Sequence, residues 1–214
     1  MRTIRVTGKG NLKLRPDTTR LTITLSGTYP EYADAVENCA KDTQSLRNTL
    51  KNFTFSESDL KTLSFHVDSK YEYRDDGYGN SERVFVGYEY QHEMKLEFKS
   101  DNQRLGKTLY ALTRSNVNPQ FKIGYTVADA EAAKNQLLED AVADARQKAS
   151  VLTQAANVNL KEIQSIDYSW GEIDLDVSYT RKPLLCGALP DFDLNIEPDD
   201  IEVSDTVTVI WEIA

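Results

Sequence analysis

The chain has 214 residues, 40% of them hydrophobic and 28% charged, which is the composition of a globular protein and excludes an intrinsically disordered chain. Its 34 acidic and 25 basic residues give a formal charge of −9, which repels phosphate groups and argues against a nucleic-acid partner. No apolar run approaches the roughly 18 residues of a membrane-spanning helix, so the sequence predicts a soluble protein without a membrane span.

The N-terminal part of the chain carries two strand patterns separated by a turn. Apolar and polar residues alternate over residues 4–14, and Gly8 and Gly10 interrupt the pattern where a bulge or a bend fits. After the turn residues 15–17, a second alternating pattern covers residues 21–25. We therefore expect a bent first strand that forms a hairpin with the second strand.

A ferredoxin-like order of elements is predicted for residues 19–127. Helices are indicated where apolar residues recur every three or four positions, and strands where they alternate. The expected elements are a strand from residue 19, a helix over 30–53, strands over 60–73 and 84–98 around a glycine-rich loop, a helix over 102–114 and a strand over 120–127. Their order is β-α-β-β-α-β, which many functions share.

The most prominent pattern is a long alanine-rich helix over residues 129–156. Asp129 is a suitable N-cap, and a stripe of alanines lets the helix lie close to a sheet. A strand over 160–168, an acidic connection over 174–200 and an alternating final strand follow. The sequence thus predicts an α+β fold in which antiparallel sheets are packed by this long helix and two further helices.

Six short segments are informative because of their order. They are Val6-Thr7-Gly8-Lys9-Gly10, Arg15-Pro16-Asp17, Asp59-Leu60-Lys61-Thr62, Tyr71-Glu72-Tyr73, Gly87-Tyr88 and the helical stretch from Asp140 to Ala149. Each is a weak motif alone, but their order and spacing extend over nearly the whole chain. Together they resemble the SIMPL-domain family, a bacterial family of largely unknown function that includes a periplasmic immunogen.

The resemblance implies an α+β fold, frequent export to the periplasm or cell surface, ring- or channel-like homo-oligomers and a loose link to oxidative stress. It brings no catalytic residues. This chain departs from the usual pattern because no apolar leader comes before the first strand pattern. We therefore expect a cytoplasmic location, with a periplasmic or extracellular one as the alternative if a signal peptide has been removed.

The extent of the domain is also an expectation from these patterns. We treat residues 1–214 as a single SIMPL-like domain. The alternative is a subdivision into a ferredoxin-like part, 1–127, and a part with the long helix and the C-terminal strands, 128–214.

The two histidines are candidates for metal ligands, because imidazole binds transition metals. His66 and His92 lie on the two strands of the predicted hairpin, but the alternation places them on opposite faces, so we expect no shared metal site. Cys39 falls within a helix, far in sequence from both histidines, and is expected to be a buried or tolerated thiol rather than a nucleophile. Gly8-Lys9-Gly10 lacks the third glycine and the following helix of a phosphate-binding loop.

The acidic connection holds part of a calcium-loop pattern. Asp191, Asp193, Asn195 and Glu202 fall at positions 1, 3, 5 and 12 of that loop. Ile196 stands where the loop requires glycine, and a strand follows where a helix is required. We expect a solvated acidic loop, keep the four residues as weak candidates for binding a divalent cation, and expect no cofactor.

Five tyrosines gather toward the turn of the predicted hairpin: Tyr71, Tyr73, Tyr78, Tyr88 and Tyr90. Core packing accounts for most tyrosines in proteins, but the side chain is also favoured in interfaces, where it brings a large apolar area with a polar tip. We predict that this end of the hairpin contacts another subunit or a partner.

The sequence therefore favours a non-enzymatic binding or scaffold protein that forms homo-oligomers through exposed sheet edges and the tyrosine-rich hairpin. The chain has no GxSxG elbow of the serine hydrolases. The alternative is a small-ligand-binding protein, or an enzyme that the motifs do not reveal, with a pocket between the long helix and the sheet or under the 174–200 connection.

Overall fold

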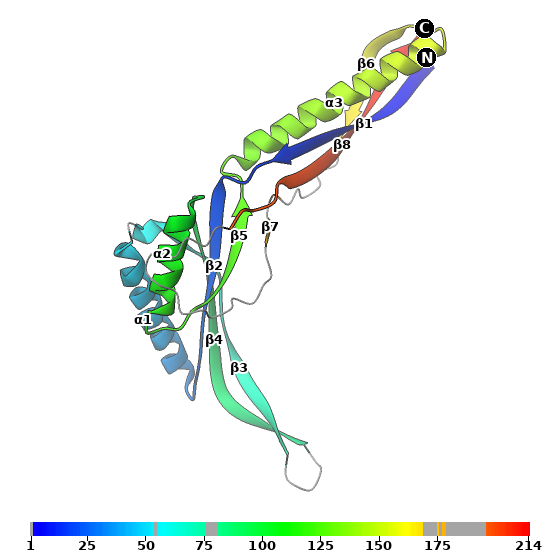
Figure 1. The fold of residues 1–214 in the computed structure, drawn as a ribbon. Coiled ribbons are helices and arrows are strands. Elements are labelled where there is room, and N and C mark those ends of the chain that lie inside the picture. Colours follow the sequence, from blue (N-terminus) through cyan, green and yellow to red (C-terminus); the bar gives the residue numbers. More distant parts are fainter. Residues whose placement is uncertain (1, 54, 76–80, 169–174, 176, 179–195) are drawn as a thin grey trace. The chain divides into compact units, whose positions relative to one another are not determined.

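The computed structural model describes residues 2–53, 55–75, 81–168, 175, 177–178 and 196–214 (Figure 1). The elements are β1 (Arg2–Leu14), β2 (Thr18–Tyr29), α1 (Tyr32–Lys51), a short 3-10 helix (Glu57–Asp59), β3 (Leu60–Asp75), β4 (Ser81–Lys99), α2 (Asn102–Thr113), β5 (Gln120–Thr126), α3 (Ala130–Ala155), β6 (Leu160–Asp167), β7 (Val177–Ser178) and β8 (Ile201–Ile213). These elements confirm the predicted α+β fold.

The chain divides into two compact units. Unit 1 consists of residues 1–17, 126–177 and 198–214, and unit 2 of residues 18–125 and 178–197. Unit 1 is therefore built from three separate segments. The division differs from a cut at residue 127, because the N-terminal strand lies with the long helix and the C-terminal strand.

Unit 2 contains a sheet with the strand order β3-β4-β2-β5-β7. Its first four strands, with α1 and α2 between them in the chain, have the ferredoxin-like arrangement that the order of elements predicts. The β2–β4 pair is antiparallel and in unbroken register from Thr18↔Lys99 to Tyr29↔Tyr88. In the β3–β4 hairpin, the register shifts between Thr62 and Ser64 and between Lys70 and Tyr71.

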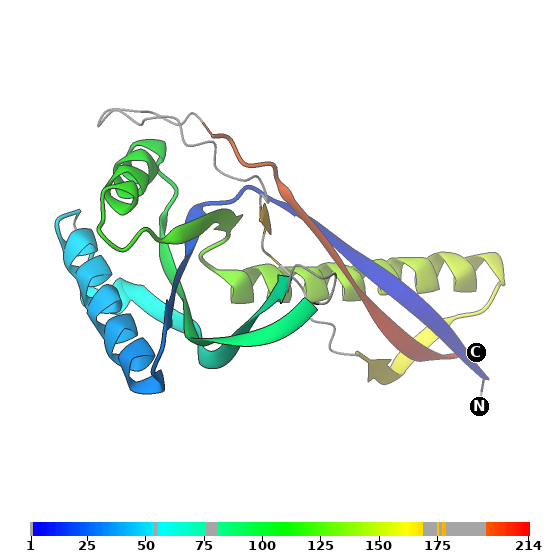
Figure 2. The same cartoon turned by 90° about the horizontal axis from the view of Figure 1, so that it is seen from below.

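Helices α1 and α2 cover the same face of this sheet (Figure 2). Successive side chains of a strand point to opposite faces of the sheet, and in these strands the apolar side chains are those that face the helices. The helices pack on them with their own apolar stripes. The largest buried side chains of this core include Leu21, Ile23 and Leu25 of β2, Met94 and Leu96 of β4, Leu46 of α1, and Leu105 and Leu112 of α2. The helix-covered part of β4 is therefore fixed firmly, which sets the position of His92 in the same strand.

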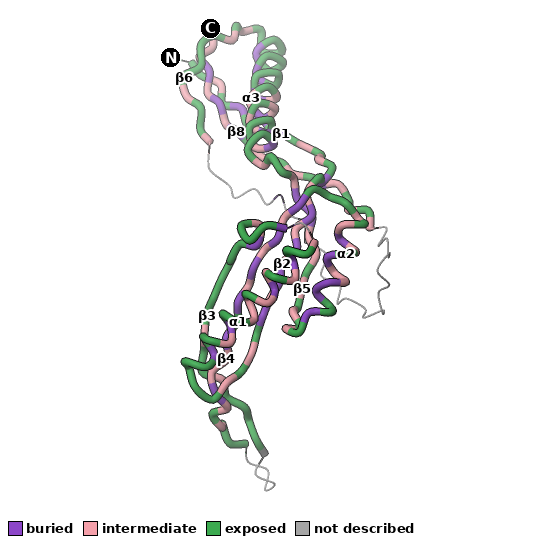
Figure 3. The backbone as a smooth tube through the Cα atoms, turned by 90° about the vertical axis from the view of Figure 1, so that its left-hand side faces the viewer, coloured by how far each residue is buried: buried purple, intermediate pink, exposed green. Residues whose placement is uncertain are grey.

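In unit 1, α3 packs on a sheet with the strand order β1-β8-β6. Asp129 caps the helix as predicted, because its carboxylate accepts a hydrogen bond from the backbone N–H of Ala132 at 2.9 Å. Three helix alanines, Ala141, Ala145 and Ala149, are fully buried against Val207, Val209 and Trp211 of β8 and Val6 of β1. They form the buried stripe that runs along α3 in Figure 3.

The two glycines of β1 allow α3 to approach the strand closely. A Cβ atom added at Gly8 would lie 2.0 Å from the carbonyl oxygen of Ala141, and one at Gly10 would lie 2.1 Å from that of Leu137. Of the two alternatives considered for Gly8 and Gly10, a bulge is absent, since β1 pairs with β8 in unbroken register from Arg2↔Ile213 to Leu14↔Ile201. The predicted hairpin between the first two strands is also wrong, because β1 pairs with β8 and β2 pairs with β4.

Candidate functional site

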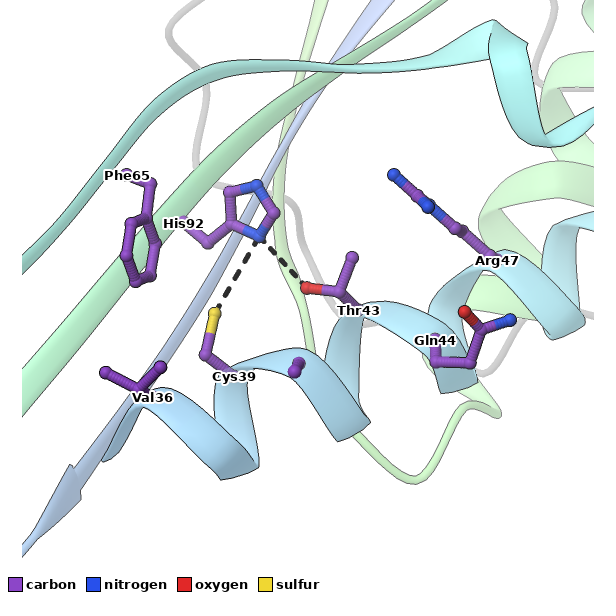
Figure 4. A pocket seen from close by; sticks show the side chains of 8 residues that line it. Val36, Cys39, Thr43, Gln44, Arg47, Phe65 and His92 are labelled. Atoms are coloured by element: carbon purple, nitrogen blue, oxygen red, sulfur yellow. Dashed lines mark hydrogen bonds between the residues drawn. The ribbon is translucent and has the colours of Figure 1, made fainter. Parts of the chain in front are cut away.

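A pocket lies in unit 2 between α1 and the β3–β4 hairpin. It has a volume of about 390 Å³ and is open to solvent on one side. Its lining residues are Val36, Cys39, Ala40, Thr43, Gln44 and Arg47 of α1, Phe65 of β3 and His92 of β4. Figure 4 shows His92, Cys39 and Thr43 in the middle of the pocket, with Phe65 and Val36 toward one end and Arg47 toward the other.

The imidazole of His92 is held from both sides. Its Nδ1 lies 3.0 Å from Oγ1 of Thr43 and 3.8 Å from Sγ of Cys39, both on α1. Its Nε2 lies 2.9 Å from Oγ1 of Thr62 on β3. Since the side chain is only 8% exposed, these polar contacts satisfy a ring that would otherwise be costly to bury.

The surroundings of Cys39 favour the protonated thiol over the thiolate. The side chain is buried, and burial raises the pKa of the thiol above its ordinary value, with a further contribution from the charge of Asp42. Reactive cysteines have the opposite environment, in which a nearby cation lowers the pKa and forms the thiolate. The proximity of Cys39 to His92 therefore supports packing and hydrogen bonding rather than covalent catalysis.

Arg47 carries the positive charge of the pocket. Its Nε–H is buried and has no acceptor among the described residues. The guanidinium affects its neighbours through its charge, since it contributes to lowering the pKa of His92 and of Glu57. A buried donor without an acceptor costs about 1–3 kcal/mol, so an acceptor that enters the pocket would bind favourably here.

The environment of His92 gives the protein a pH dependence. Burial, and then the charge of Arg47, lower the pKa of His92 below the ordinary value of 6.5 for histidine. As the pH falls through about 6.5, the unfolded state takes up this proton and the folded state does not, so the free energy of unfolding decreases. We expect chemical denaturation between pH 7.5 and 5.5 to show this decrease, with a slope of at most about 1.4 kcal/mol per pH unit from this group.

The variant His92→Gln should lose that part of the slope. The control is His66→Gln, because His66 lies exposed on β3 and does not line the pocket. Equal pH slopes for His92→Gln and the unmodified protein would contradict the assignment to His92.

The two histidines point to opposite faces of the hairpin, as predicted. His66 pairs in register with Gln91, and its Nε2 lies 3.1 Å from Oε1 of Gln91, whereas His92 faces α1. Among the described residues, no group of three histidine, cysteine or acidic side chains is arranged to hold a metal ion.

The weak calcium candidates do not form a site in the described part of the chain. Asp191, Asp193 and Asn195 lie outside the described residues. Glu202 is at the start of β8 in unit 1, where its carboxylate lies 3.3 Å from Nζ of Lys13. This carboxylate therefore has a lysine partner within its own sheet.

A row of aromatic rings continues the core face of the hairpin beyond the N-terminal end of α1. We call Tyr71, Phe85, Tyr88 and Tyr32 the aromatic row; successive ring centroids are 5.5 Å, 5.4 Å and 5.6 Å apart. Tyr32, Tyr71 and Phe85 are 53%, 43% and 45% exposed, so the row is open to solvent. The guanidinium of Arg83 lies 3.9 Å from the centre of the Tyr71 ring.

The five tyrosines predicted from the sequence occupy different environments. Tyr71 and Tyr88 belong to the aromatic row, and Tyr73 is the most exposed aromatic residue described, at 74%. Tyr90 is 1% exposed and lies in the core, where its hydroxyl donates to Asp42 at 2.5 Å. Tyr78 lies outside the described residues. The row also includes Tyr32 and Phe85, which the sequence reasoning missed because it considered only tyrosines within the hairpin.

The sequence indicated two places for a pocket. One was between the long helix and the sheet, where the backbone of α3 packs directly against Gly8 and Gly10. The other was under the 174–200 connection, most of which lies outside the described residues. The observed pocket brings Cys39 and His92 together over 53 positions of sequence. Helix α1 buries Ala35, Cys39, Leu46 and Leu50, which places Cys39 on the side that faces the sheet.

Comparison with known proteins identifies relatives along nearly the whole chain. Residues 4–211 match the model of the SIMPL family, described as a protein of unknown function (DUF541). The chain is 23% identical to the 26 kDa periplasmic immunogenic protein of Brucella melitensis biotype 1 over 211 residues, which cover 98% of this chain and 84% of that protein. The protein of the same name from Brucella abortus matches with the same identity and coverage.

The predicted cytoplasmic location is wrong, because both relatives are named as periplasmic proteins. Signal peptides are removed from mature exported proteins. The strand and helix patterns of the folded domain therefore give no information about export. No helix among the described residues is both long and apolar enough to cross a membrane. The match over residues 4–211 agrees with the resemblance carried by the six short segments and leads to one conclusion: the chain belongs to the SIMPL family.

Proposed function

We propose that the protein is a non-enzymatic binding or scaffold protein of the periplasm, and that it assembles with further copies of itself. The observation that carries this proposal is the aromatic row on the β3–β4 hairpin. Its rings continue a face that is covered by α1 elsewhere, yet three of the four are about half exposed. Contiguous exposed aromatic surface is typical of protein interaction sites.

The free edge of the same hairpin supports this proposal. Strand β3 has 16 residues and lies at the edge of its sheet, paired with β4 alone in the described part of the chain. Unpaired N–H and C=O groups along an edge strand can pair with another strand, and proteins usually shield them. A second copy of the chain would cover the edge and the aromatic row together, which makes a copy the partner that fits best.

The test is the mass of the assembly in solution. We expect the unmodified protein to sediment as a multiple of its 24.2 kDa chain, and the double variant Tyr71→Ser/Phe85→Ser to sediment at the mass of one chain. Both side chains are exposed, so the substitutions should leave the circular dichroism spectrum unchanged.

A matched control removes exposed apolar surface elsewhere. Val151 on α3 is 60% exposed and lies outside the hairpin, so Val151→Ser should assemble like the unmodified protein. The proposal fails if the unmodified protein sediments as a single chain at all concentrations, or if the double variant keeps the assembled mass.

A further inference from the structure

The pocket between α1 and the β3–β4 hairpin combines two kinds of surface that a single ligand would satisfy. Toward one end, Arg47 presents a guanidinium whose buried Nε–H has no acceptor among the described residues, and the amide of Gln44 lines the same pocket. Toward the other end, Phe65 and Val36 are 48% and 38% exposed, so apolar surface remains uncovered beside the opening. Figure 4 shows these ends on either side of His92.

The middle of the pocket offers little further charge. His92 carries a lowered pKa and is therefore neutral at neutral pH, and its polar contacts are Thr43, Thr62 and the Cys39 thiol. Among the described residues, no lysine or acidic side chain lines the cavity. A ligand with one negative charge would match the single arginine of this lining, whereas a multiply charged anion would be repelled more strongly by a chain of formal charge −9.

We propose that this pocket binds a small organic carboxylate with an aromatic or branched apolar body. The carboxylate accepts hydrogen bonds from the Arg47 guanidinium, whose Nε and terminal nitrogens form a fork that matches the two carboxylate oxygens. The apolar body covers Phe65 and Val36. The volume of about 390 Å³ lies within the range of about 300–1,000 Å³ typical of small-molecule sites.

The first experiment compares an acid with its neutral isostere on the unmodified protein. The probes are 3-phenylpropionate and 3-phenylpropionamide, which share the apolar body and differ in charge, and binding is measured by calorimetry. We expect the acid to bind at least about tenfold more tightly than the amide, which is the effect of a charge-assisted hydrogen bond. Equal affinities, or binding of neither probe at millimolar concentration, would overturn the proposal.

The second experiment tests the role of Arg47. We expect Arg47→Gln to weaken binding of the acid at least about tenfold, and Arg47→Lys to weaken it less, because lysine keeps the charge but loses the fork. Lys41→Gln is the matched control, since it removes the same charge from the exposed side of α1, where Lys41 pairs with Glu37 at 2.6 Å. Its affinity for the acid should equal that of the unmodified protein.

The proposal of a ligand site and the proposal of self-association can be refuted independently of each other. None of the residues changed here belongs to the aromatic row, and Tyr71→Ser/Phe85→Ser leaves the pocket lining intact. Loss of binding in Arg47→Gln with retained assembly, and loss of assembly in the hairpin variant with retained binding, are the expected pair of results.

Discussion

Replacing Gly8 with alanine is expected to lower the free energy of unfolding by about 3 kcal/mol or more. The added Cβ atom would lie 2.0 Å from the carbonyl oxygen of Ala141, 2.4 Å from the backbone nitrogen of Ala145 and 2.7 Å from the Cβ of Ala145. Two of these three atoms belong to the helix backbone, so no change of rotamer relieves the clash. The helix must move away from β1, which disturbs the packing of its buried alanine stripe.

The measurement is urea denaturation followed by circular dichroism. Lys9→Ala is the control, because Lys9 is the next residue of β1 and its exposed side chain points away from the helix. That variant keeps the backbone N–H of residue 9, which donates to Asp144 at 2.7 Å, and should change stability by no more than about 0.5 kcal/mol. If Gly8→Ala unfolds at the same urea concentration as the unmodified protein, the close approach of α3 to β1 is wrong.

Replacing Tyr90 with phenylalanine is expected to lower the free energy of unfolding by about 1–3 kcal/mol. The hydroxyl of Tyr90 donates to Oδ2 of Asp42 at 2.5 Å, and the ring, 1% exposed, stacks with Tyr29 at 6.3 Å between centroids. Phenylalanine keeps the ring but leaves the partly buried carboxylate of Asp42 without this donor. The control is Tyr73→Phe, whose exposed hydroxyl should contribute nothing measurable.

The effect of Tyr90 should also depend on alkaline pH. Burial, and then the hydrogen bond to Asp42, raise the pKa of Tyr90 well above the ordinary value of 10.0 for tyrosine. Above about pH 10 the unfolded chain releases the phenol proton and the folded protein keeps it, so the contribution of Tyr90 to stability falls as the pH rises. The difference in stability between the unmodified protein and Tyr90→Phe should therefore narrow above pH 10, and a constant difference would contradict this assignment.

The elements that the sequence predicted well are those with a clear local period. The long helix, the ferredoxin-like order and the opposite orientation of His66 and His92 all follow from spacings of about 3.6 or of two residues. Such spacings can be recognised in a short stretch of sequence, a few helical turns or strand positions long. They do not depend on which other segment of the chain packs against that stretch.

The parts that the sequence did not predict depend on contacts between distant segments. Alternation in β1 identifies a strand but not its partner, and the partner is β8, about 200 residues away, instead of the adjacent β2. Glycine in a strand is compatible both with a bulge and with close approach of another backbone, and only the position of α3 distinguishes the two at Gly8. The contact between Cys39 and His92 could not be predicted without two further facts: the register of the strands in the sheet, and the face of α1 that is turned toward it.

The pairing of β1 with β8 also determines an order of events in folding. Arg2 lies opposite Ile213, so the sheet of unit 1 closes a loop of almost the entire chain, while most of unit 2 is the continuous stretch 18–125. A chain that becomes available for folding from its N-terminus onward, during synthesis or export, can complete the ferredoxin-like part first, but β1 has no strand partner until the last strand is available. Contacts of such long sequence separation are slow to form. Unit 1 is therefore the part that stays exposed to proteases and to other chains for longest, and removal of the final strand would leave β1 without a strand partner and the alanine stripe without Val207, Val209 and Trp211.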